Sequence, residues 1–140
     1  MKNILLFLVL LFVVGCKDDS LFVKKYNSSN KPIYLKTISF KTDNYYLLDK
    51  VMRSFKKYGF EENNTSKYLI KLTSHYVINC KNPVVHALGA DFNGYIGLEF
   101  YDGKNELYRI QKDFKSKVTN DMIDEIVKRL IRDMKLSPSR

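Results

Sequence analysis

The chain has 140 residues, with 24 Lys and Arg against 15 Asp and Glu, and a formal net charge of +9. This length suits one domain with a real hydrophobic core and excludes a pair of domains. The positive charge favours an anionic partner (nucleic acid, acidic lipid, lipopolysaccharide or peptidoglycan), although an AT-rich genome, which favours Lys, Asn, Ile and Tyr codons, would produce the same composition.

The chain opens with an apolar run, Ile4 to Val14, that ends at Gly15 and Cys16. The run is shorter than the about 20 residues of a membrane-spanning helix, and its length is typical of a secretory signal. The tetrapeptide that ends at Cys16 resembles the bacterial lipobox, which closes with a small residue and a cysteine. The resemblance implies that residues 1–15 are a signal peptide and that Cys16 carries a covalent lipid. A plain secretory signal and an uncleaved anchor are the alternatives.

Two further expectations follow from this signal. Lys17, rather than Asp, comes after Cys16, and in enteric bacteria this favours the outer membrane, with the protein facing the periplasm. Export also argues against a nucleic-acid partner. Because the lipid would occupy Cys16, we expect Cys80 to lack a partner within the chain and to be a small, at least half-buried residue; an intermolecular disulfide is the alternative.

The segment from Cys16 to Lys31 is polar, and we expect a lipidated, flexible tether there, with one domain over residues 32–140. Residues 33–40 are rich in β-branched and aromatic side chains and predict one strand. Its alternation is imperfect, which a bulge or cover on both faces would explain. A helix should follow, capped by Thr42 or Asp43 and stopped by Gly59.

The remainder predicts three strands and a second helix. Residues 68–78 alternate, with Lys71, Thr73 and His75 facing away from the apolar side. Residues 79–94 resemble a loop, and residues 95–101 and 107–114 should form a hairpin around Asp102-Gly103-Lys104-Asn105. A helix capped by Thr119 or Asn120 should then run to about Met134. The order β-α-β-β-β-α predicts an α+β two-layer sandwich: a mainly antiparallel sheet of about four strands, with both helices on one face.

The sequence offers little catalytic chemistry. His75, Cys80, His86 and Asp91 are the one cluster of metal-ligand types, and their spacing matches no common zinc pattern. A Cys80–His86 nucleophile pair would need an orienting group and an oxyanion pocket that nothing marks. We therefore expect no enzyme, no metal and no cofactor beyond the lipid on Cys16. Lys71 and Arg109, on outward strand faces, are the candidate contacts for an anionic ligand.

The order of these segments resembles the lipopolysaccharide-assembly lipoproteins, the LptE-like family. The resemblance covers the chain from Ile33 onward and includes four pieces: Ile33-Tyr34-Leu35-Lys36-Thr37-Ile38, Tyr68-Leu69-Ile70-Lys71-Leu72, the hairpin that begins Tyr95-Ile96-Gly97, and the closing helix of residues 121–136. It implies docking with an outer-membrane β-barrel and contact with lipopolysaccharide, whose phosphates would suit a basic surface. Transport-auxiliary, surface-exclusion, flagellar and peptidoglycan-related lipoproteins share similar layouts and remain alternatives.

Overall fold

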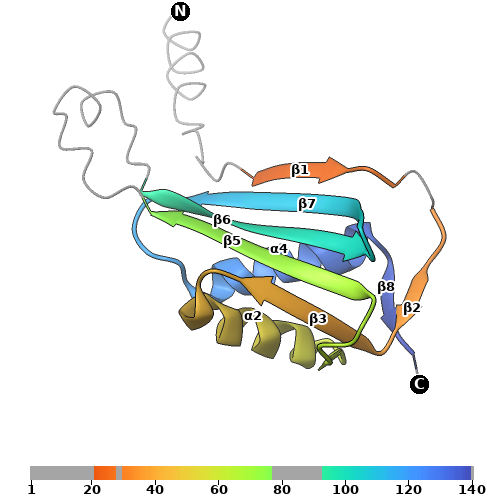
Figure 1. Ribbon diagram of the computed structural model, residues 1–140. Coiled ribbons are helices and arrows are strands. Elements are labelled where there is room, and N and C mark those ends of the chain that lie inside the picture. Colours follow the sequence, from red (N-terminus) through yellow and green to blue (C-terminus); the bar gives the residue numbers. More distant parts are fainter. Residues whose placement is uncertain (1–20, 28–29, 77–92, 140) are drawn as a thin grey trace, which may run out of the picture.

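The computed structural model describes residues 21–27, 30–76 and 93–139, which form an α+β domain (Figure 1). The predicted signal peptide, Cys16, Cys80, His86 and Asp91 lie outside the described residues. Six strands form the main sheet in the order β1-β7-β6-β5-β3-β4, and a separate pair consists of β2 and β8. The elements are β1 (Leu21–Lys25), β2 (Ile33–Leu35), β3 (Thr37–Thr42), α2 (Tyr45–Lys57), β4 (Glu61–Glu62), β5 (Tyr68–Tyr76), β6 (Gly94–Asp102), β7 (Asn105–Phe114), α4 (Asn120–Asp133) and β8 (Leu136–Pro138).

The α+β class is confirmed, but the sheet is larger than predicted and mixed in direction. Adjacent strands among β5, β6, β7 and β1 are antiparallel, whereas β3 runs parallel to both β5 and β4. The reason is the helix α2 between β3 and β5. A crossover helix returns the chain to the end of the sheet at which it started, so that the second strand must run parallel to the first.

The prediction of a flexible tether before the domain is wrong in part. Leu21–Lys25 forms β1, which pairs with β7 along the sheet edge. Two of its residues explain the pairing. Leu21 and Val23 alternate with the exposed side chains of Phe22 and Lys24 and pack against the hydrophobic core, so that they share its apolar face.

The single strand predicted over residues 33–40 is also wrong. The chain divides at Lys36 into β2, which pairs with β8 after the last helix, and β3, which lies in the main sheet. This division explains the broken alternation, since Leu35 and Ile38 are each buried within a different strand pair.

Helix α2 begins one residue later than predicted. The Asn44 side chain, rather than that of Thr42 or Asp43, accepts a hydrogen bond from the Leu47 backbone N–H (3.3 Å), while the Thr42 hydroxyl accepts one from the Asn44 N–H (2.9 Å). The stop at Gly59 is confirmed, because its φ of 89° lies in the left-handed region. The Thr119 cap of α4 is confirmed as well.

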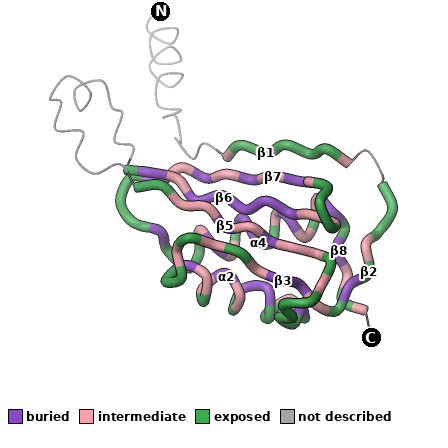
Figure 2. Tube along the Cα trace, viewed as in Figure 1, coloured by how far each residue is buried: buried purple, intermediate pink, exposed green. Residues whose placement is uncertain are grey.

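Both helices cover one face of the sheet and contact each other (Figure 1). Apolar side chains form the core between the layers, and the buried residues, purple in Figure 2, lie along both helices and the central strands. The core residues with no exposed surface include Val51, Ile70, Leu98, Ile110 and Ile126. None of the described helices is long and apolar enough to cross a membrane.

The domain therefore has two ends and one open face. The proximal end carries the starts of both helices together with the ends of β3, β5 and β7 (Figure 1), and Leu21 at the start of β1 pairs with Lys112, two residues before β7 ends there. The distal end carries the β6–β7 turn and the β2–β8 pair. The open face is the side of the sheet that α2 and α4 do not cover.

Candidate functional site

The open face carries a row of charged residues that crosses five strands. Lys41 pairs in register with Lys71, Lys71 with Glu99, Glu99 with Arg109, and Arg109 with Lys24. Because partners in register lie on the same side of a sheet, these five residues form one line, about 19 Å long at the usual strand spacing of about 4.8 Å. We call this line the basic row. It contains four cations and one carboxylate.

The structure brings together both residues predicted as ligand contacts, Lys71 and Arg109, on either side of Glu99. The Glu99 carboxylate lies 3.3 Å from the Lys71 ammonium and 3.5 Å from the Arg109 guanidinium. Arg109 also donates two hydrogen bonds to the Glu106 carboxylate (2.8 and 3.1 Å). Part of the charge of both predicted residues is therefore balanced within the protein.

Glu99 is nearly buried, with 7% of its surface exposed. Burial raises the pKa of this carboxyl, but hydrogen bonds from Tyr101 and Lys71 and the charge of Arg109 outweigh it and lower the pKa below the usual range. The Tyr101 hydroxyl donates its hydrogen bond over 2.5 Å. Burial and this bond to a carboxylate raise the pKa of Tyr101 to about 12. Glu99 is thus held ionised at the centre of the row.

The two ends of the basic row are exposed and place like charges next to each other. Lys24 and Lys41 are both exposed, and each lies directly across from another cation. Like charges in register destabilise a sheet, and an anion bound along the row would remove this repulsion. A hollow of about 130 Å³ lies beside the row, where Gly97 leaves space next to Glu99 and Arg109.

Sequence reasoning identified Lys71 and Arg109 from their outward alternation but missed the other members. Lys24 lay in the expected tether, and Lys41 lay past the end of the predicted strand. Strand alternation predicts the face on which a residue lies but not its partner on the neighbouring strand. No local pattern in the sequence indicates this pairing register.

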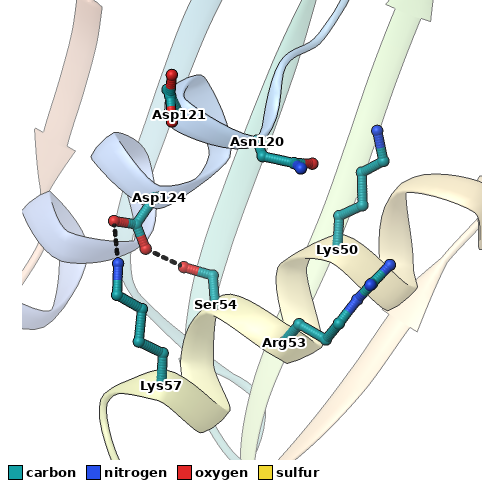
Figure 3. Close-up of a pocket in the computed structure, with 7 residues that line it drawn as sticks. All are labelled: Lys50, Arg53, Ser54, Lys57, Asn120, Asp121 and Asp124. Carbon is teal, nitrogen blue, oxygen red and sulfur yellow. Dashed lines mark hydrogen bonds and ion pairs between the residues drawn. The ribbon is translucent and has the colours of Figure 1, made fainter.

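A second surface lies on the helix side of the domain and extends from the proximal end toward the end of α2. The groove between α2 and α4 has a volume of about 260 Å³ and carries Lys50, Arg53 and Lys57 on one side and Asn120, Asp121 and Asp124 on the other (Figure 3). Asp124 accepts hydrogen bonds from Ser54 (2.9 Å), Lys57 (2.9 Å) and the Tyr58 hydroxyl (3.2 Å). The pKa of the Asp124 carboxyl is lowered, and the hydrogen bond from Lys57 is the main cause. This end of the groove therefore joins the helices.

The groove continues into a hollow of about 330 Å³, which shares Lys50 and Asn120 with it and adds Tyr46, Tyr76 and Lys117. Three tyrosines at this end are largely exposed: Tyr45 by 77%, Tyr46 by 73% and Tyr76 by 43%. The Lys50 ammonium lies over the Tyr46 ring, 4.7 Å from its centre. We call Tyr45, Tyr46, Tyr76, Lys50 and Lys117 the proximal surface. The signal for it was a tyrosine pair just before the apolar helix stripe, which sequence reasoning passed over.

Of the four residues of metal-ligand type singled out in the sequence, only His75 lies in the part of the chain that the structure describes. Its ring lies on the open face and stacks on Tyr95, with ring centres 5.8 Å apart. Within residues 21–27, 30–76 and 93–139, no group of three or more His, Cys, Asp or Glu side chains is arranged to hold a metal ion.

No model of a known protein family matches this sequence, and no curated protein matches it either.

Proposed function

We propose that this protein is a bacterial outer-membrane lipoprotein, held by a lipid on Cys16, whose domain is a non-enzymatic binding component of an envelope assembly machine. The observation that supports this best is the basic row. Four cations around one ionised carboxylate cross an open sheet face, in an arrangement that an anionic partner would stabilise.

Lipopolysaccharide assembly with a β-barrel partner is the best single candidate for the machine. The elements β3, α2, β5, β6, β7 and α4 follow one another in the order on which the resemblance to the LptE-like lipoproteins rests, with β1, β2, β4 and β8 as additional strands and both helices packed on one sheet face. Phosphate groups of lipopolysaccharide would be suitable ligands for Lys24, Lys41, Lys71 and Arg109, because charge-assisted hydrogen bonds to phosphate are strong.

The second candidate is an anionic-lipid-binding or transport-auxiliary lipoprotein without a barrel partner. A carrier would need an internal cavity, and apolar side chains with no exposed surface fill the layer between sheet and helices. The proximal surface favours lipid contact on the outside of the domain instead. Other envelope roles (flagellar, peptidoglycan or surface exclusion) share the same anchor.

The test is recovery of the full-length lipoprotein from detergent extracts through an affinity tag at its carboxyl end. We expect an outer-membrane β-barrel protein to be recovered with it. The Lys71→Glu variant should recover less of that barrel protein than the distal control Lys104→Glu. Recovery of no barrel protein would exclude the barrel partner. A measured mass of the purified wild-type protein that shows no acyl groups on Cys16 would exclude the lipid anchor.

A further inference from the structure

We infer that the proximal surface lies against the membrane that holds the lipid anchor, where it contacts anionic phospholipid headgroups. The inference rests on the lipid anchor of the proposed function and adds to it an orientation and a contact surface. It depends on the length of chain between Cys16 and the first strand, on the exposed tyrosines and on the lysines next to them.

The chain between the anchor and the domain is short. Leu21, the first residue of β1, is five residues after Cys16. Five residues span at most about 18 Å when fully extended. Leu21 must therefore stay within this distance of a lipid-bearing Cys16 at the membrane surface.

This limit determines which end faces the membrane. Leu21 pairs with Lys112 of β7, and Lys112 is seven residues from Asn105, where β7 begins at the distal end. This distance is about 24 Å at the usual rise per residue. With the distal end against the membrane, Leu21 would be farther away than the chain allows. The proximal end, to which Leu21 is closer and at which α2 and α4 begin (Figure 1), is therefore the end nearer the membrane.

The proximal surface has the side chains that membrane interfaces favour. Tyrosine places an apolar ring among the lipids and keeps its hydroxyl in the wet headgroup layer, and Tyr45, Tyr46 and Tyr76 are all exposed there. Lys50 and Lys117 line the same hollow and would attract anionic headgroups. Asp43 and Asp121 are also exposed at this end, so the tyrosine rings rather than net charge carry most of the contact.

Both helices begin at this end, so that the positive ends of their dipoles point toward the headgroups. The orientation also places the basic row parallel to the membrane. Lys24 lies three residues beyond Leu21 along β1, which places the row about 10 Å from Leu21, on the side away from the proximal end.

The chain has no tryptophan, and this permits a direct test with two single-tryptophan variants of the full-length lipoprotein. Tyr46→Trp places the fluorophore on the proximal surface. Tyr34→Trp is the matched control, because Tyr34 is 68% exposed but lies in β2 at the distal end. Each variant is reconstituted into vesicles of phosphatidylethanolamine and phosphatidylglycerol that contain a headgroup-nitroxide lipid, and the loss of tryptophan emission is measured.

We expect a large loss of emission for Tyr46→Trp and little for Tyr34→Trp, with the loss at residue 46 reduced by Lys50→Glu but not by Lys104→Glu. Equal quenching of both variants, or quenching of neither in protein that floats with the vesicles, would overturn this inference alone. Protein that does not float with the vesicles would overturn the lipid anchor, and this inference with it.

Discussion

The carboxylate of Glu99 lies 3.3 Å from the ammonium of Lys71, its direct partner across the β5–β6 pair. On its other side Glu99 faces Arg109 in β7. A carboxylate enclosed in this way separates two cations that would otherwise repel each other, and it limits the charge that the row presents to a ligand.

Glu99→Gln should therefore destabilise the domain and strengthen its binding of anions. Hydrogen bonds to charged groups contribute about 1.5–3 kcal/mol, so we expect the free energy of unfolding at neutral pH to fall by about 2 kcal/mol. Urea unfolding measures the loss. Lipopolysaccharide binding in low salt measures the gain, and weaker binding by the variant would contradict this role of Glu99.

The pH dependence of this difference has a defined sign. Since the pKa of Glu99 is lowered in the folded protein, its ionised form contributes stability above the unfolded pKa of about 4.3. That contribution is lost as the pH falls through the folded pKa. The free energies of unfolding of the wild-type protein and of Glu99→Gln should therefore differ most at neutral pH and become similar in acid. The control is Glu106→Gln, which removes only the Arg109 partner.

Charge reversal within the basic row should weaken anion binding. Lys71→Glu and Arg109→Glu each replace a cation beside Glu99 with a second carboxylate, and we expect lipopolysaccharide binding to fall in both variants. Binding by the wild-type protein should also fall steeply with salt, because the interaction is between exposed charges. Unchanged binding after both substitutions would refute these two positions as ligand contacts.

Asp124→Asn should loosen the contact between the two helices. The Asp124 carboxylate accepts a hydrogen bond from the buried Ser54 hydroxyl (2.9 Å), and losing its charge should cost on the order of 1 kcal/mol of unfolding free energy. The lowered pKa of Asp124 again makes this difference largest at neutral pH and smaller in acid. Asp121→Asn, on the same helix and in the same groove, is the control and should change thermal stability little.

Substitution by alanine should have very different effects on stability at two glycines. Gly94 has a φ of 151°, and a methyl group there would lie 2.0 Å from the His75 carbonyl oxygen, so Gly94→Ala should disrupt the β5–β6 pairing. Gly103, in the hairpin turn, has a φ of 59° and open space around it, so Gly103→Ala should cost only the left-handed strain of about 1–2 kcal/mol. Thermal unfolding compares them, and equal losses would contradict this account.

Local patterns in the sequence determined both helices, the hairpin turn and the faces of the long strands. The stop at Gly59 located the end of α2, the cap at Thr119 located the start of α4, and alternation placed Lys71, Thr73 and His75 on the open face. These features depend on neighbours a few residues apart, and that is why one sequence is enough to predict them.

Only the tertiary structure decided which segments pair. Leu21–Lys25 became an edge strand because β7 offered an unpaired edge and the core an apolar surface for Leu21 and Val23. Residues 33–40 divided because the return of the chain after α4 provided β8 as a partner for β2. The basic row likewise joins Lys24, Lys41, Lys71 and Arg109 through registers between strands far apart in the chain, and long-range packing sets those registers rather than local sequence.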